Sequence, residues 1–423
     1  MFKKEKLTNG LPVIISPLKE TQVVTVLVMF GIGSRYEHSP IRGLSHFIEH
    51  MMFKGTTKRP DAQTLTRAID SLGGVSNAFT SKDATGYYIK VNAKHLERAI
   101  EILSDMLLHS KFAAAEINRE KGVILEEINM REDNPMIHIE DLFEIVLLGD
   151  QPIGWDTAGT RQTIREMQRQ DFTAYVKKHY QAGNAVIGLA GAVTPKDGYA
   201  LVNKYFGKMV AGQPSVPKPV DLKFSRREIH LAYRDSEQTH LGLGFPAYSY
   251  THPDLMAQEV LATILGGNMS SRLFSVVREK HGLAYYIRTL TGQYSDTGVF
   301  LIQSGLDTKR VELALKLIMA ELRKITRQPV KSEELSRAKE YLKGHLAIQM
   351  EDSENLINWQ LRQHLMEKKI KTVPEKFQEI DRVTAADVKR VAADLITESH
   401  LNMALIGPFK DKQKFDRLTR FSA

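Results

Sequence analysis

The strongest pattern in this sequence is Gly43-Leu44-Ser45-His46-Phe47-Ile48-Glu49-His50-Met51-Met52-Phe53. It predicts a helix that is capped by Ser39, has Pro40 in its first turn, where a proline costs no hydrogen bond, and stops near Gly55. Most residues of the stretch are apolar. Two histidines and a glutamate in such surroundings need polar partners if they are buried, and a metal ion would supply them.

The polar side chains of this predicted helix form a metal-binding pattern. His46 and His50 are four residues apart, so both imidazoles project from one helical face. Two neutral imidazoles in that arrangement suit a tetrahedral Zn²⁺, and the carboxylate of Glu49 beside them suits a general base for water. The order H-x-x-E-H inverts the thermolysin-type H-E-x-x-H motif. The alternative is a surface helix that carries histidines without binding a metal.

A second predicted helix, residues 114–131, offers a third ligand. Glu120 and Glu127 are seven residues apart, so they share a face of this helix, whereas Glu126 is rotated away. A zinc site of this kind needs a third protein ligand, which is often a carboxylate. Glu127 is the expected ligand, and Glu120 is expected to orient one of the histidines. Glu126 remains an alternative ligand, and a solvated acidic face is the alternative for any one of these glutamates.

Composition limits the possible functions. The 423 residues are too many for one ordinary domain, and 42% apolar with 26% charged residues is typical of a globular protein. The absence of cysteine excludes disulfides, thiol nucleophiles and cysteine zinc sites. No signal-peptide core and no membrane-span-length apolar run are found, so a cytoplasmic protein without a membrane partner is expected. The net charge is +8, but the basic residues are scattered, so no nucleic-acid partner is expected.

The chain divides into two halves that resemble each other. Residues 212–222 contain three prolines and form the expected linker between a zinc-binding half, 1–211, and a second half, 223–423. Residues 171–191 align with residues 387–407 without a gap, which favours a duplication over chance similarity. In a further alignment His46 falls on Glu259 and His50 on Thr263. The second half is therefore expected to lack the metal.

Several stretches together resemble the shorter members of the pitrilysin (M16) metallopeptidase family, similar to the processing-peptidase β subunit. The resemblance covers essentially the whole chain and is carried by residues 43–50, 76–80, 119–128 and 269–285. It implies an α+β fold of two related halves, each a mainly antiparallel sheet backed by helices. It also implies one Zn²⁺ per chain, held by His46, His50 and Glu127, with Glu120 behind the ligands.

The same resemblance implies an activity and further site residues. It implies a zinc endopeptidase in which Glu49 is the general base and a peptide or unfolded segment is bound as an added strand in an enclosed chamber. The residues it assigns to the substrate are Asn77, Ala78 and Phe79, which pair with the substrate backbone, and Arg278 and Tyr285, which contact the substrate at the scissile bond. An acidic cluster predicts some preference for basic residues near the cut: Glu126, Glu132, Asp133, Glu140 and Asp141.

Other classes of function stay open alongside the enzyme. A non-catalytic M16-like structural or presenting subunit would typically lose part of H-x-x-E-H, and this chain keeps all of it. A zinc-stabilised binding module is a further alternative. Because the chain carries both the zinc set and Arg278 with Tyr285, a homodimer is expected, in which each zinc site is completed by the second copy. A heterodimer with an M16 homologue is the alternative assembly.

Overall fold

The computed structural model describes residues 2–421, apart from the side chains of Phe224 and Ser225. The chain forms two compact units. The first consists of Met1–Ile128, Trp155–Lys218 and Ala347–Thr372, and the second of Asn129–Gly154, Pro219–Leu346 and Val373–Ala423. Each unit is built mainly from one of the expected sequence halves, 1–211 and 223–423, and takes one segment from the other half. None of the described helices combines the length and apolar character needed to cross a bilayer.

The first unit is organised around a six-stranded sheet. Its strand order is β1 (Lys3–Lys6), β2 (Pro12–Pro17), β6 (Ala185–Gly191), β3 (Val23–Phe30), β5 (Thr85–Asn92) and β4 (Val75–Thr80). Only β2 and β6 run parallel. The central strand β3 is almost entirely buried because its run of β-branched and apolar residues is covered on both faces. Strand β4 pairs with β5 alone and therefore forms an edge of the sheet.

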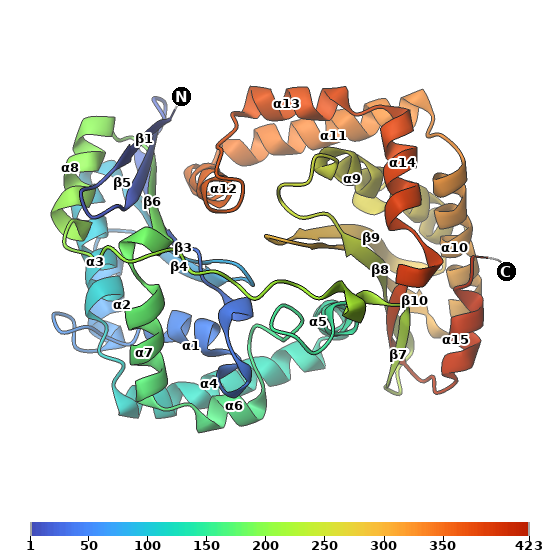
Figure 1. Ribbon diagram of the computed structural model, residues 1–423, viewed down its shortest axis with the longest axis horizontal. Helices are drawn as coiled ribbons and strands as arrows, with labels where there is room; N and C mark the ends of the chain where they lie inside the picture. The colour runs from blue at the N-terminus through green and yellow to red at the C-terminus, as the bar shows by residue number, and fades with distance from the viewer. Residues whose placement is uncertain (1, 422–423) are drawn as a thin grey trace. The chain divides into compact units, whose positions relative to one another are not determined.

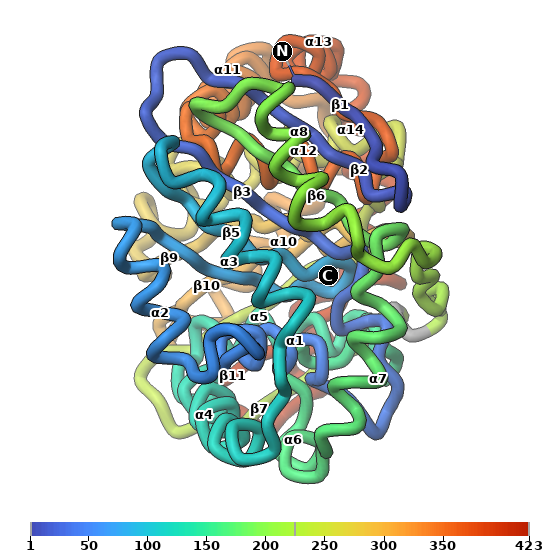
Figure 2. Tube along the Cα trace, turned by 90° about the vertical axis from the view of Figure 1, so that its left-hand side faces the viewer, coloured from blue at the N-terminus to red at the C-terminus, as the bar shows by residue number. Residues whose placement is uncertain are grey.

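Helices cover both faces of this sheet. On the face turned to the viewer in Figure 2 lie helices of the first half. The helices packed against the strands are α1 (Leu44–Met51), α2 (Ala62–Asp70), α3 (Leu96–His109) and α8 (Pro195–Phe206). Three more helices contribute buried residues to the same core: α4 (Ala114–Asp133), α6 (Arg161–Glu166) and α7 (Arg169–His179). The other face is covered by α12 (Ser353–Met366), whose Ile357 and Leu361 are fully buried. A Cβ atom on Gly188 of β6 would lie 2.4 Å from Ile357 Cγ1, so glycine lets α12 approach closely.

The second unit repeats this topology with five strands. Their order is β7 (Glu228–Tyr233), β11 (Asn402–Gly407), β8 (Gln238–Ala247), β10 (Gly298–Asp307) and β9 (Ala284–Gln293), and only β7 and β11 are parallel. This is the connectivity of β2, β6, β3, β5 and β4. The helices are α9 (Leu255–Ala262), α10 (Val311–Arg327), α11 (Ser332–Met350), α13 (Val373–Arg382), α14 (Ala385–Leu395) and α15 (Lys412–Leu418). The two mainly antiparallel sheets backed by helices confirm the predicted α+β class.

Two equivalent helices are exchanged between the units. Helix α5 (Pro135–Leu148) follows α4 in the sequence and packs on β8 and β11 of the second sheet, while α12 follows α11 and packs on β3 and β6 of the first (Figure 1). Glycine again permits the contact, because a Cβ atom on Gly244 would lie 2.8 Å from Phe143 Cζ of α5. Each sheet is thus completed by a helix from the other half of the sequence.

The N-terminus of α1 differs from the sequence-based expectation. The helix begins at Leu44, and Gly43 is its N-cap with a left-handed φ of 93°. Ser39 belongs to a separate 3₁₀ turn and does not cap α1. Its place is taken by the buried carboxyl group of Glu37, whose two oxygens accept hydrogen bonds of 2.7 Å from the N–H groups of Gly43 and Ser45. A carboxyl group suits this position because the first N–H groups of a helix have no partner within the helix.

Candidate metal centre and active site

Three side chains from α1 and α4 form a triangle of metal-ligand atoms. Their ligand atoms all lie within 4.8 Å of one another. His46 Nε2 and His50 Nε2 are 3.2 Å apart, and each is 3.5 Å from Glu127 Oε2. Ligand atoms bound to tetrahedral zinc at about 2.0–2.1 Å are separated from one another by about 3.3–3.4 Å. The donor set therefore fits Zn²⁺ in both chemistry and spacing.

Glu120 holds one of the two histidines from the side opposite this triangle. Its Oε1 lies 2.9 Å from His50 Nδ1, and its Oε2 lies 2.6 Å from Lys54 Nζ. An acceptor at Nδ1 keeps the proton on that nitrogen, so the lone pair of Nε2 points toward the triangle. Burial lowers the pKa of His50, but hydrogen bonds to Glu120 and Glu127 outweigh it and raise the pKa to about 9. The two carboxylates that favour a proton on this imidazole would equally favour a metal cation bound at Nε2 in place of that proton.

The structure distinguishes the two candidate glutamates of α4. Glu127 contributes the carboxylate of the triangle, whereas the side chain of Glu126 is exposed and outside it. Successive helical residues are rotated by about 100°, so only one of two neighbours can face α1. Within residues 2–421, no other group of three such ligand side chains comes together.

Glu49 lies beside the triangle and is held by the edge strand β4. Thr80 Oγ1 donates a hydrogen bond of 2.5 Å to Glu49 Oε2. Burial raises the pKa of Glu49, and this hydrogen bond partly opposes the effect. Thr80 is not among the site residues predicted from sequence. The sequence pattern that could have identified Thr80 is the alternation of side chains along a strand, which places Thr80 on the same face as Ala78.

The three residues predicted to bind substrate lie on β4 but differ in what they present. Ser81 N–H donates a hydrogen bond to the carbonyl oxygen of Ala84. In an antiparallel pair every second residue bonds to the neighbouring strand in this way, so counting back from Ser81, Phe79 and Asn77 bond to β5. The N–H and C=O groups of Ala78 therefore point away from β5, toward the open edge of the sheet. Asn77 Oδ1 accepts a 2.9 Å hydrogen bond from this Ala78 N–H. The main chains of Asn77 and Phe79 instead face β5. A strand added at this edge would therefore bond to Ala78.

Arg278 and Tyr285 belong to the second unit. Arg278 lies on a π-helical segment, Phe274–Lys280, with its guanidinium carbon 4.8 Å from the centre of the Phe274 ring. Tyr285 lies on β9, an edge strand of the second sheet, and is 77% exposed. Neither residue is part of the unit that holds His46 and His50.

Two acidic residues behind the predicted preference for basic substrates are paired with arginines. Glu140 Oε1 lies 2.8 Å from Arg288, and Asp141 Oδ1 lies 2.6 Å from Arg131. All four residues belong to the second unit. Part of the acidic charge is therefore neutralised within the protein, which weakens the argument for basic residues near the cut.

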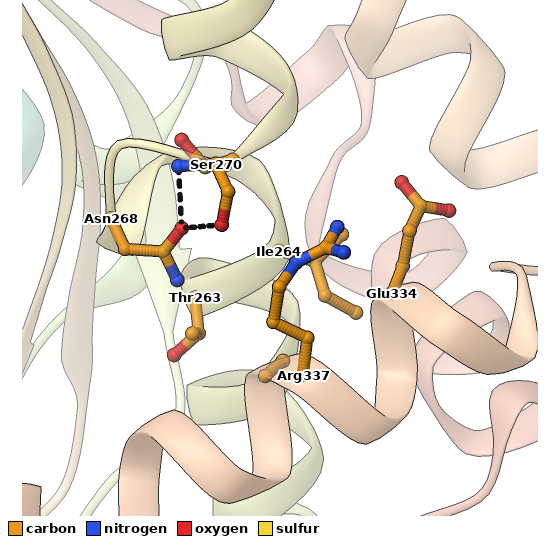
Figure 3. Close-up of a pocket in the computed structure, with 8 residues that line it drawn as sticks. Thr263, Ile264, Asn268, Ser270, Glu334 and Arg337 are labelled. Atoms are coloured by element: carbon orange, nitrogen blue, oxygen red, sulfur yellow. Dashed lines mark hydrogen bonds between the residues drawn. The ribbon is translucent and has the colours of Figure 1, made fainter.

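A small polar pocket of about 200 Å³, including its open mouth, lies in the second unit (Figure 3). Asn268 Oδ1 accepts hydrogen bonds of 3.0 and 2.9 Å from the main chain and the hydroxyl of Ser270. Glu334 and Arg337 of α11 also line the pocket, and Glu334 Oε1 accepts a 2.8 Å hydrogen bond from Arg272 Nε. No histidine is among the residues that line it: Thr263, Ile264, Asn268, Ser270, Ser271, Glu334, Arg337 and Ala338. This pocket lacks the donors of the candidate metal centre.

Comparison with known proteins gives matches along nearly the whole chain. Residues 13–160 match the family described as Insulinase (Peptidase family M16), and residues 166–342 match the Peptidase M16 inactive domain. The uncharacterized zinc protease YmxG of Bacillus subtilis is 34% identical over 415 residues, covering 96% of this chain and 98% of that protein. A solved protease from Helicobacter pylori has a TM-score of 0.88 at 24% identity, covering 96% of this chain and 99% of that one. A solved peptidase M16 inactive domain from Pseudomonas fluorescens has a TM-score of 0.89 at 20% identity, covering 97% and 98% of the two chains.

Proposed function

Because this chain belongs to peptidase family M16, we propose that it is a zinc-dependent endopeptidase with one Zn²⁺ per chain. The observation that carries the proposal is the ligand triangle of His46, His50 and Glu127, whose edges of 3.2–3.5 Å suit tetrahedral zinc. Glu49 lies next to these ligands, and its carboxylate is not part of the ligand triangle. Three ligands, one open coordination position and a neighbouring base are the components of a hydrolytic zinc site.

The side chains around the triangle have distinct proposed roles. Zinc bound there would polarise a peptide carbonyl and lower the pKa of a water molecule. Glu49 would accept the proton of that water and deliver it to the leaving amine nitrogen. Thr80 would hold the Glu49 carboxylate in position through its 2.5 Å hydrogen bond. Glu120 would fix the orientation and tautomer of His50.

We propose that the substrate binds as an extended strand along β4. The main chain of Ala78 would pair with the peptide, which displaces the side chain of Asn77 from the Ala78 N–H. Binding through main-chain groups requires an extended peptide, so short peptides and unfolded segments are favoured over folded proteins. Asn77 and Phe79 would shape the adjoining surface with their side chains.

The proposed assembly is a homodimer that encloses the peptide in a chamber. Arg278 and Tyr285 of one copy would contact the substrate at the zinc site of the other copy. A heterodimer with an M16 homologue is the alternative assembly. The homodimer is favoured because a single chain carries both the metal ligands and Arg278 with Tyr285, so two identical copies would suffice.

The proposal is tested by measuring zinc content and peptide cleavage in parallel. Wild type should bind one equivalent of zinc and cleave members of a fluorogenic peptide library, and removal of zinc by a chelator should abolish cleavage. Glu49→Gln should keep its zinc and lose activity. Zinc-loaded wild type that cleaves no member of a broad library would instead support the non-catalytic M16-like subunit.

A further inference from the structure

The side chains of β4 alternate between two faces that have different functions. Ala78 packs against the core cluster that includes α1, and Thr80 contacts Glu49 on the same side. Phe79 packs on the opposite face, against the cluster that includes Ile357 and Leu361 of the exchanged helix α12. A peptide added beside β4 would follow the same alternation. Every second substrate side chain would therefore meet α12 rather than the metal centre.

Arg362 of α12 presents a cation on this second face. Its guanidinium carbon lies 5.1 Å from the centre of the Phe79 ring, and its Nε donates a 3.1 Å hydrogen bond to Asn358 Oδ1. Within residues 2–421 the arginine forms no ion pair. The acidic residues at the start of α12, Asp352 and Glu354, already bond to Lys90 and Tyr88. The charge of Arg362 is thus available to a ligand.

The position of this cation is fixed by stacked groups from three elements. Gly86 of β5 has no side chain, and a Cβ atom there would lie 2.4 Å from Phe79 Cζ, so the ring lies across the strand at this point. The ring in turn supports the guanidinium, which favours planar stacking on aromatic rings. The hydrogen bond to Asn358 orients the group from its own helix. An arginine held in this way loses little side-chain entropy when it binds a carboxylate.

We infer that Arg362 is a specificity-determining residue that binds an acidic side chain of the peptide, at the substrate position opposite Phe79. This inference rests on the proposed peptidase function. Directly opposite residues of two neighbouring strands place their side chains on the same face, with Cβ atoms about 4.5–5.5 Å apart. A glutamate or aspartate opposite Phe79 would therefore stand beside the ring that Arg362 covers.

The same geometry places this substrate position near the bond that is cut. Thr80 contacts the proposed general base Glu49, and Phe79 is the adjacent residue. One residue along a strand is about 3.3 Å. The acidic residue should therefore lie within one or two positions of the scissile bond. The preference for basic substrate residues predicted from sequence rests on a different set of side chains, the acidic cluster near α4. Two members of that cluster, Glu140 and Asp141, are already paired with arginines.

The test uses pairs of peptides that differ only by Glu or Gln at one position, scanned on both sides of the cleavage site. Wild type should prefer Glu at one position by about threefold to tenfold in kcat/KM, the range for a charge-assisted contact at a partly exposed site. Arg362→Gln should remove the preference, Arg362→Lys should retain part of it, and Arg362→Glu should favour Lys at the same position. Lys369→Gln, which removes an exposed cation from the same chain segment, is the matched control and should leave the preference unchanged.

Failure of this inference can be separated from failure of the proposed function. The same peptide pairs are also bound to Glu49→Gln and to the double variant with Arg362→Gln, with affinity read by fluorescence anisotropy. Tighter binding of the Glu peptide that depends on Arg362 supports the inference even if no peptide is cleaved. Equal cleavage and equal binding of the Glu and Gln peptides at every position would overturn it. A preference that persists in a folded, zinc-loaded Arg362→Gln protein would do the same.

Discussion

Replacing Glu120 by glutamine should weaken zinc binding without unfolding the protein. Glu120 is 3% exposed and links two partners, with His50 Nδ1 at 2.9 Å and Lys54 Nζ at 2.6 Å. Glutamine has the same shape, and its amide oxygen can still accept the hydrogen bond from His50. Its amino group would then face the ammonium group of Lys54. Lys54 is 25% exposed in its side chain, so it can turn to solvent at little cost.

Two independent estimates give the size of the expected effect. Loss of a residue that orients a metal-bound histidine typically lowers metal affinity by about 10- to 100-fold, or about 1.4–2.7 kcal/mol. A hydrogen bond to a charged group contributes about 1.5–3 kcal/mol, and this variant replaces a charged acceptor by a neutral one. The two ranges overlap. We therefore expect a zinc dissociation constant about 10- to 100-fold higher than that of wild type.

Competition with a chromophoric chelator measures this constant directly. The control is Glu116→Gln, one turn earlier on α4, which also breaks an ion pair, with Arg119 at 2.6 Å, but does not touch a histidine. Glu127→Gln should weaken zinc binding more than Glu120→Gln does because it alters a proposed ligand. Glu126→Gln should have no effect. At saturating zinc, Glu120→Gln should recover most of its activity.

An unchanged zinc affinity in Glu120→Gln would refute the orienting role of Glu120. An equal loss in Glu116→Gln would show that the effect comes from helix α4 as a whole. Activity that stays low at full zinc occupancy would mean that Glu120 acts on a step other than metal binding.

Three further outcomes follow from the site and its supports. Thr80→Val should lower kcat by about tenfold or more while zinc content stays constant, because Glu49 loses a hydrogen bond to its carboxylate; steady-state kinetics with zinc analysis checks this. Burial raises the pKa of Glu37 from 4.5 to about 8. Between these two pH values the folded state keeps the proton of Glu37 and the unfolded state has lost it, so each increase in pH lowers the free energy of unfolding. The free energy of unfolding of wild type relative to Glu37→Gln, from urea denaturation, should therefore fall between about pH 4.5 and 8, and a constant difference would contradict the assignment. Mixing inactive Glu49→Gln and Arg278→Ala proteins should restore up to about a quarter of wild-type activity if a homodimer exchanges subunits, because random pairing gives half heterodimers with one intact site each. No recovery despite demonstrated exchange would favour a site completed within one chain.

The features that sequence can predict depend on local spacing. The separations of four and seven residues within single helices fix which side chains share a face, and the structure brings His46, His50, Glu120 and Glu127 together accordingly. Whether Glu126 or Glu127 meets α1 could not be decided from spacing alone. That choice depends on how α4 is rotated against α1, which is set by packing between elements distant in sequence.

The features that sequence missed depend on contacts between elements. Thr80 reaches Glu49 across 31 positions of sequence, from a strand to a helix. Glu37 caps α1 from six residues before Gly43, outside the usual capping window. The apolar faces of α5 and α12 indicate that these helices are buried, but they do not indicate which sheet each one covers. Only the structure shows the exchange that brings Arg362 to Phe79.

The exchange of α5 and α12 has a consequence for how the chain is made. The last strand of the first sheet ends at Gly191, but the helix that covers its second face begins about 160 residues later, at Ser353. At about 5–20 residues per second, a ribosome needs roughly 10–30 s to synthesise the intervening segment. During that interval one apolar face of the first sheet has no helix to cover it. A nascent chain of this length is therefore expected to depend on chaperones, and synthesis that stops after the linker should give an aggregation-prone fragment instead of a folded half.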